Sequence, residues 1–452
     1  MSKVEQPTHV VGIVGGACAG SVVAEHLAQR GCQVIVFEQN PRPYGKIEDG
    51  LPRWHKKQRD MEYRKIDERL DRAGVHFVPN TRLGRDISFA DLASEWGLSV
   101  LVLANGAWTD RKLDDPRADE VVDKGLVYQN AFVYWFNHMN EAGYDGPRYE
   151  VVDEAVVVGG GLASIDVIKI LQLELYGRAL RARGIEVDTN ELEHHGIPKV
   201  CHEHGIEDPE SLGVKGAVLL YRRRVEDMPL ASAAKDAPQK VKDRLPQVRQ
   251  KILEKCQKKY LFQVQTQRLV KEVVIEDGRL TGVVLLETAL QGRDAVPVPG
   301  SEHVLRTDLV ISSIGSIPEP IEGIAMKGTY YQFKDWDTGE YAALPGVFAA
   351  GNVVTGQGNI VASLEHGRFV GEHLAERYLG ISDDDSRELG QTPAEALAAS
   401  AGEAVAEALE SKPKLSPEQA NALLARVAAR QREVGYEAYQ PWIQRVTPAD
   451  ME

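Results

Sequence analysis

At 452 residues the chain is long enough for two or three domains, and its 43% hydrophobic and 27% charged residues are typical of a globular protein in water. The formal net charge of −14 argues against broad nucleic-acid binding, because phosphate backbones are held by basic surfaces. No stretch reaches the roughly 18 to 20 apolar residues that a membrane span needs, and the start has no signal-peptide pattern. We therefore expect a cytoplasmic protein that binds neither nucleic acid nor a membrane.

The first predicted unit is a strand, a glycine turn, a helix and a strand, in VVGIVGGACAGSVVAEHLAQRGCQVIVFEQ (residues 10–39). VVGIV and QVIVFE are short β-branched runs, and SVVAEHLAQR has helical spacing and ends at Gly31. Two buried strands that are joined by one helix must run parallel. The stretch therefore predicts a β-α-β crossover.

The turn in this unit has the spacing of a dinucleotide-binding turn with one substitution. Gly15 permits the sharp bend and Gly20 allows close helix packing, while the free amides at the helix N-terminus face a pyrophosphate. Ala17 stands where the second glycine is usual, and we expect it to displace the phosphate slightly. Glu38 closes the second strand, where its carboxylate can accept hydrogen bonds from ribose hydroxyls. The alternative is a tight turn of an α/β core that binds no nucleotide.

A second unit of the same kind begins at EAVVVGGGLASIDVIKILQLEL (residues 154–175), with its glycines at 159–161. The acidic residue expected about 20 positions later is missing, and the next strand, AVLLY, ends instead in three arginines at 222–224. A guanidinium fork suits the 2′-phosphate of NADP, which a carboxylate would repel. The pattern favours NADP over a solvated basic strand end.

The remaining strands predict that one unit is inserted into the other. LSVLVLANGAWTDRKL (98–113) and LVISSIGSIPEP (309–320) each indicate a buried strand running into a turn, and residues 346–380 indicate a strand, a glycine-rich turn and a helix. We predict an α/β fold of two Rossmann-like nucleotide-binding domains. The outer domain comprises residues 1–112 and 318–380, and the inserted domain comprises 113–317.

Residues 381–452 predict a helical C-terminal extension. Its first part is acidic and rich in alanine, which indicates a linker and loose helices. In SPEQANALLARVAARQREV, Ser416 at the N-cap, Pro417 at N1 and Gln419 at N3 make the capping-box start of a final helix. We expect the closing aromatic residues, in 436–442, to pack on the body of the protein or on a second subunit.

Together these segments resemble the flavoprotein family of the adrenodoxin-type ferredoxin–NADP reductases and the NADPH-oxidising small subunit of glutamate synthase. YRRRVEDMP (221–229) resembles the Y-R-R-x-x-x-x-M-P segment of that subunit, and GGGLASIDV (159–167) the family's G-x-G-N-x-A-x-D turn. YGKIEDGLPRWHK (44–56) is similar to the flavin-side G-G-x-x-x-x-G-I-P stretch. LANGA (103–107) is similar to the closing strand of the FAD half, and FAAGNVVTGQGNI (348–360) to the turn beside the flavin.

The resemblance implies FAD in the outer domain and NADPH in the inserted one. It assigns to FAD the residues Gly15, Ala17, Cys18, Ala19, Gly20, Glu38, Gly45, Lys46, Ala104, Gly106, Gly351, Asn352, Gly358, Asn359 and Ile360. It assigns to NADPH the residues Gly159, Gly161, Leu162, Ala163, Arg222 and Arg223. The chain departs from the family's pattern at Ala17, Lys46, Leu162 and Asn352, where two glycines, an asparagine and an aspartate are usual.

The implied reaction is hydride transfer from nicotinamide C4 to flavin N5 over about 3 to 3.5 Å, without an enzyme nucleophile. The resemblance implies that His55 lies near the flavin and relays a proton to it, whereas the alternative is an exposed histidine beside two lysines. A flavin can release its electrons singly, which suits a ferredoxin or flavodoxin as acceptor. Basic residues in 53–65 and 235–259 either steer such an acidic partner or are solvated helix faces.

No metal site is predicted. The four cysteines, Cys18, Cys32, Cys201 and Cys256, form no C-x-x-C pair, which argues against a disulfide scaffold, a dithiol centre or an iron–sulfur site. HHGIPKVCHEH (194–204) gathers ligand types, but its spacing matches no zinc motif, so a helical surface insertion is favoured.

Other functions stay open on the sequence alone. The chain could be the NADPH-oxidising subunit of a larger complex, with the C-terminal extension as its docking arm. It could reduce or hydroxylate a small molecule in its own pocket. It could also be a nucleotide sensor that retains the fold without turnover. A homo-oligomer is compatible with each of these functions.

Overall fold

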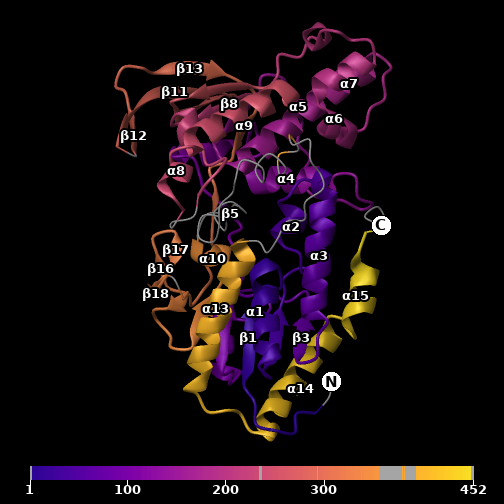
Figure 1. Ribbon diagram of the computed structural model, residues 1–452, viewed down its shortest axis with the longest axis vertical. Coiled ribbons are helices and arrows are strands. Elements are labelled where there is room, and N and C mark those ends of the chain that lie inside the picture. Colours follow the sequence, from indigo (N-terminus) through magenta and orange to yellow (C-terminus); the bar gives the residue numbers. More distant parts are fainter. Residues whose placement is uncertain are drawn as a thin grey trace.

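The computed structural model describes residues 3–233, 237–292, 294–336, 338–355, 379, 381 and 393–448. Two halves are stacked along the long axis of the molecule, and each is built on its own sheet (Figure 1). Within the described ranges no helix is long and apolar enough to cross a bilayer.

The first half is built on a seven-stranded sheet in the order β18-β19-β20-β4-β1-β2-β3. Its strands are β1 Val10–Val14, β2 Gln33–Phe37, β3 Val75–Val78, β4 Val100–Leu103, β18 Phe333–Asp335, β19 Glu340–Tyr341 and β20 Val347–Ala349. Its helices are α1 Cys18–Gln29, α2 Lys46–Asp49, η1 Arg53–His55, α3 Lys56–Leu70, η2 Asp91–Glu95 and α10 Asn352–Thr355. β20, β4, β1, β2 and β3 run parallel, and every residue of β1 and β4 is buried because helices and loops cover both faces.

The second half is built on a five-stranded parallel sheet in the order β6-β14-β7-β8-β9. Its strands are β6 Leu126–Tyr128, β7 Val156–Val158, β8 Val218–Tyr221, β9 Gln263–Thr266 and β14 Val310–Ser312. An antiparallel sheet adjoins it, made of β10 Arg268–Glu276, β11 Arg279–Gln291, β12 Asp294–Pro297 and β13 His303–Arg306. The helices are η3 Pro116–Val121, α4 Gln129–His138, α5 Leu162–Ala182, α6 Thr189–His195, α7 Ile197–Glu203, η4 Pro209–Leu212, η5 Val225–Asp227, α8 Gln239–Lys242 and α9 Leu245–Tyr260.

The chain passes between the halves through a two-stranded antiparallel ribbon, β5 Thr109–Asp110 paired with β15 Ser316–Ile317. A further small ribbon, β16 Met326–Lys327 with β17 Tyr330–Tyr331, follows in the first half. All strands of the second sheet lie in sequence between β4 and β18 of the first. This arrangement confirms the predicted fold class, in which one Rossmann-like domain is inserted into the other. The domain limits at 112/113 and 317/318 fall next to the ribbon and stay predictions.

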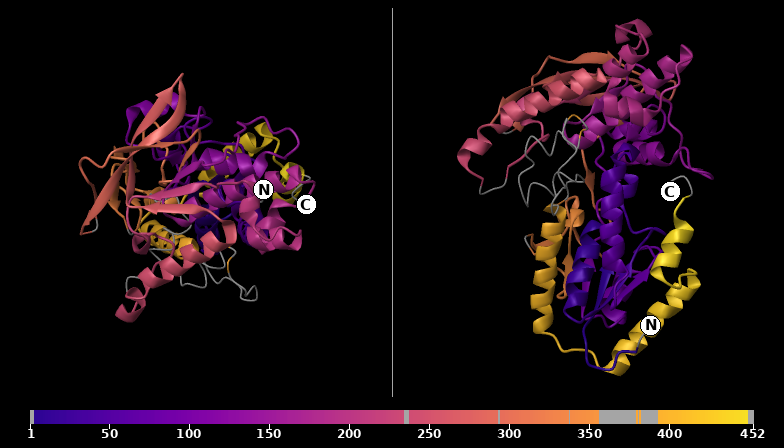
Figure 2. Two further views of the ribbon diagram at one scale, coloured as in Figure 1. Left: turned by 90° about the horizontal axis from the view of Figure 1, so that it is seen from above. Right: turned by 45° about the vertical axis from the view of Figure 1, so that its right-hand side comes forward.

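The C-terminal extension wraps the first half with α13 Pro393–Glu410, α14 Pro417–Glu433 and α15 Tyr439–Val446. These gold helices pass along opposite sides of the first half (Figure 2). The predicted capping box of Ser416 and Gln419 is present, and the Trp442 indole donates a hydrogen bond to the Pro41 carbonyl at 2.7 Å. The closing aromatics thus pack on the body of the same chain.

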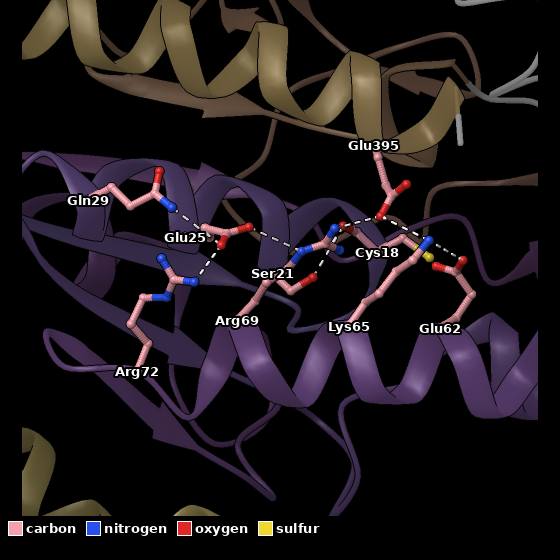
Figure 3. Close-up of polar contacts among 9 residues, drawn as sticks. All are labelled: Cys18, Ser21, Glu25, Gln29, Glu62, Lys65, Arg69, Arg72 and Glu395. Carbon is pink, nitrogen blue, oxygen red and sulfur yellow. Dashed lines mark hydrogen bonds and ion pairs between the residues drawn. The ribbon is translucent and has the colours of Figure 1, made fainter. Parts of the chain in front are cut away.

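An ionic cluster fixes the first of these helices to the body, so the expectation of loose helices is wrong for α13. Arg69 of α3 bonds Glu395 of α13 at 2.5 Å and Glu25 of α1 at 3.3 Å (Figure 3). Lys65, one turn earlier in α3, lies 3.6 Å from the same Glu395 carboxylate. Glu395 is only 2% exposed, so this contact is part of the core between three helices.

Candidate functional site

A cavity opens where the carboxyl ends of β1, β2 and β4 meet the start of α1. The space between its walls, open mouth included, is about 1120 Å³. Its lining includes these predicted FAD residues: Gly15, Ala17, Cys18, Ala19, Glu38, Gly45, Lys46, Ala104, Gly106, Gly351 and Asn352. Four segments that are far apart in the sequence therefore converge on one cavity. Gly358, Asn359 and Ile360 lie outside the described residues.

Steric contacts explain two glycines of the first turn. Gly15 has φ of 97°, and a Cβ on it would lie 2.4 Å from the Ala104 carbonyl oxygen. A Cβ on Gly20 would lie 1.8 Å from the Gly15 oxygen, so Gly20 packs α1 onto the strand and does not line the cavity. Ala17 has φ of −71° and ψ of −153°, an extended conformation that any residue adopts. The alanine at this position therefore causes no backbone strain.

Glu38 presents a buried carboxylate to the cavity at the end of β2. The Gly16 amide donates to its Oε2 at 2.8 Å and the Asn40 amide donates to its Oε1 at 3.0 Å. Burial raises its pKa to about 7, against the effect of these two hydrogen bonds. The two amides orient the carboxylate, and its remaining lone pairs can accept hydrogen bonds from a sugar.

The wall of the cavity also contains a lysine. Lys46 opens α2, and its Nζ donates to Asn130 Oδ1 at 3.0 Å and to Ser316 Oγ at 3.1 Å. The ammonium also lies 5.5 Å from the centroid of the Trp108 ring, which lines the same cavity. Trp108, Asn130 and Ser316 were missed by the sequence analysis. Only Trp108, which directly follows LANGA, offered a signal in the sequence.

The second glycine turn is packed as tightly as the first. A Cβ on Gly159 would lie 2.2 Å from Ser164 Oγ, and one on Gly160 would lie 2.3 Å from the ring of Tyr221. Gly161 caps α5, which begins with the predicted residues Leu162 and Ala163. Because Tyr221 ends β8, the turn lies next to the arginines that follow that strand.

These arginines differ in their surroundings. Arg222 is exposed and Arg223 is half-buried, whereas Arg224 forms an ion pair with Asp227 at 3.0 Å. The Arg222 backbone is held because Thr288 Oγ1 donates to its carbonyl at 2.6 Å. Arg222 is therefore open to solvent next to the second turn, and the half-buried Arg223 follows it in the chain.

His55 joins the two halves. Its Nε2 lies 3.6 Å from Asp166 Oδ1, and the two side chains are only 8% and 3% exposed. His55 was identified from the sequence and Asp166 is the aspartate of the GGGLASIDV turn, but their contact was not predicted, since one lies in η1 and the other in α5. The alternative of an exposed histidine is wrong. Its neighbours Lys56 and Lys57 are the residues that face solvent.

The segment HHGIPKVCHEH and the Cys18 thiol contain further metal-ligating or nucleophilic groups. Among the described residues no group of three or more His, Cys, Asp or Glu side chains could hold a metal. Within HHGIPKVCHEH, Cys201 is buried while His202 is exposed and pairs with Glu207. Burial raises the pKa of the Cys18 thiol to about 12, although it lies at a helix N-terminus.

Comparisons with known proteins agree with this geometry. Residues 13–57 match the family model described as NAD(P)-binding Rossmann-like domain. The glutamate synthase [NADPH] small chain of Mycobacterium tuberculosis is 26% identical over 386 residues, which cover 82% of this chain and 66% of that relative. The mitochondrial NADPH:adrenodoxin oxidoreductase of Arabidopsis thaliana is 30% identical over 38% of this chain and 34% of its own. The chain thus spans just under two thirds of the small chain's length.

The fold comparison covers more of the molecule. The structure of Mycobacterium tuberculosis FprA in complex with NADPH aligns with 94% of this chain and 91% of its own, with a TM-score of 0.61 and 17% identity. This likeness establishes that the two-domain fold is shared. The resemblance drawn from the motifs is therefore confirmed: the chain is similar in sequence to a glutamate synthase small chain and to an adrenodoxin oxidoreductase, and similar in fold to FprA.

Proposed function

We propose that the protein is an FAD-dependent NADPH oxidoreductase that passes electrons from NADPH through FAD to a redox partner in the cytoplasm. The observation that carries this proposal is the convergence of the predicted FAD residues on one cavity of the first half. A second nucleotide turn, flanked by Arg222 and Arg223, lies in the other half. The two halves meet at the buried contact between His55 and Asp166.

The residues of the first cavity fit FAD. The Glu38 carboxylate, oriented by two amides, would accept hydrogen bonds from the ribose of the adenosine. The amides at the start of α1 would face the pyrophosphate, since Ala17 leaves the backbone extended and adds only a methyl group there. FAD would supply hydride acceptance and one-electron release when bound.

The residues of the second half fit NADPH. The tight turn at Gly159 and Gly160 brings the start of α5 close to the nucleotide phosphates, and Arg222 and Arg223 would bind the 2′-phosphate. His55 would hold or release a proton at Nε2, and Asp166 would orient the imidazole. The domains that we assign to these roles are 1–112 with 318–380 for FAD and 113–317 for NADPH.

For the acceptor we propose a one-electron carrier such as a ferredoxin. Support comes from the relatives whose names include an adrenodoxin or a cindoxin reductase. The second candidate is an NADPH-oxidising subunit of a larger enzyme, which the glutamate synthase small chains favour. In that case the C-terminal extension is not a free docking arm, because α13 and α15 pack on the chain's own first half.

An anaerobic absorbance spectrum before and after addition of NADPH tests the proposal. The expected result is a flavin band that NADPH bleaches and NADH hardly affects. A protein that shows no flavin band after reconstitution with FAD would contradict the proposal and leave the nucleotide-sensor alternative. Reoxidation by ferredoxin or by a candidate partner enzyme then distinguishes the two acceptors.

A further inference from the structure

The proposed function assigns no role to Lys46, the lysine that lines the first cavity. Lys46 occupies a position where the related family has a glycine, and its side chain lies in the cavity wall beside Trp108. Glu38 and the turn at Gly15 define the part of the cavity suited to the adenosine and the pyrophosphate. The part that contains Lys46 and Trp108 is then left for the flavin half of FAD.

The ammonium is held in place from the other half of the molecule. Asn130 of α4 and Ser316 of β15 accept its two hydrogen bonds at 3.0 and 3.1 Å, and the Asn130 side-chain amide donates in turn to Ser316 Oγ at 3.1 Å. The long side chain is thus fixed at its end, so its charge stays at one place beside the cavity that Lys46 lines.

A hydride carries two electrons and one proton, so FAD that has accepted one from NADPH would carry one more negative charge than oxidised FAD. We propose that the Lys46 ammonium stabilises the reduced flavin relative to the oxidised flavin and so raises the flavin reduction potential; this inference rests on the proposed function. A fixed cation in a largely buried cavity favours the state with the additional negative charge.

The surroundings of Lys46 make its charge responsive to such a change. Burial lowers the pKa of Lys46 to about 8, and the carboxylates of Asp110 and Asp49 oppose this effect. Burial also raises the pKa of Asp110 to about 6, while His138 of α4 lies 3.2 Å from Asp49. An ammonium with a pKa near 8 binds a proton more tightly when a negative charge appears beside it.

The test is the midpoint potential of the FAD-loaded protein, measured anaerobically against a reference dye. Lys46→Gln keeps a hydrogen-bond donor without the charge, Lys46→Arg keeps the charge, and Lys56→Gln on the exposed start of α3 is the control. We expect Lys46→Gln to weaken binding of reduced relative to oxidised FAD about tenfold, equivalent to a potential about 30 mV lower. Lys46→Arg and Lys56→Gln should stay close to the wild type.

An unchanged potential in Lys46→Gln overturns the inference. Should that variant fail to retain FAD, the wild-type protein gives the answer by itself. Above about pH 8 reduction should draw an additional proton to Lys46, which steepens the fall of the potential with pH by about 30 mV per unit. A slope that stays constant from pH 7 to about 10 contradicts the inference. Failure of the wild type to bind FAD refutes the proposed function instead.

Discussion

The attachment of the C-terminal extension provides the sharpest test of the fold. Glu395 of α13 is 2% exposed and bonds Arg69 at 2.5 Å, so Glu395→Gln removes one partner of a buried ion pair. Removing one charge of such a pair costs about 3–5 kcal/mol because the other charge stays buried. Arg69 keeps a second carboxylate, Glu25, at 3.3 Å, and glutamine retains a hydrogen-bond acceptor. We therefore expect a loss of about 2 kcal/mol.

The same helix provides a matched control. Glu403 lies two to three turns further along α13 and pairs with Arg30 at 2.9 Å, but its side chain is 56% exposed. Exposed ion pairs contribute about 0–1 kcal/mol, so Glu403→Gln should change little. Hydrogen exchange at the amides of α13 reports the local free energy of opening, and urea unfolding reports the global value. Equal effects of the two substitutions would refute the claim that the buried cluster anchors this helix.

Three further predictions concern the two proposed nucleotide sites. Arg222→Ala should weaken NADPH binding about tenfold, through the loss of one charge-assisted hydrogen bond, and should leave NADH binding unchanged. Arg224→Ala should weaken NADPH binding less, because Asp227 neutralises Arg224. Titrations of each variant with both nucleotides measure these affinities. In the FAD-free protein the pKa of Glu38 is raised, so the folded state binds more protons than the unfolded state between about pH 4.5 and 7. The free energy of unfolding should therefore fall as the pH rises through that window. Glu38→Gln should flatten the dependence of the melting temperature on pH. The Cys18 thiol is half-buried in the cavity wall, and its pKa of about 12 keeps it protonated at neutral pH. It should therefore react slowly with iodoacetamide in the FAD-free protein, and labelling as fast as in the unfolded chain would contradict the raised pKa.

The sequence was sufficient for the features that depend on local pattern. The crossovers of β1-α1-β2 and β7-α5-β8 follow from alternating apolar runs, and Gly15 is required by a backbone angle that its neighbours in the sequence impose. The capping box at Ser416 is local in the same way. The capping box joins residues three positions apart, and each crossover follows from the order of apolar runs along the chain, so local pattern and chain order carry the information.

Contacts between distant segments could not be predicted in this way. Lys46 meets Asn130 and Ser316 across separations of 84 and 270 residues, and no periodicity links those positions. The extension looked like a loose linker because alanine-rich helices have few large apolar side chains. Its attachment includes Glu395, an acidic residue that is buried where Arg69 and Lys65 face it. Charge patterning alone assigns such a residue to the solvent.

Two of the contacts that could not be predicted from the sequence bear on the mechanism. His55 with Asp166, and Lys46 with Asn130, each join the first half to the second half, and Lys46 also lines the cavity where we place FAD. A rotation of one half against the other would break both contacts, and leaving buried polar groups unpaired costs about 1–3 kcal/mol each. We therefore expect NADPH and FAD to meet in the arrangement described here, with no prior swing of the domains. The residues that orient the halves are then the same residues that supply charge and protons to the reaction.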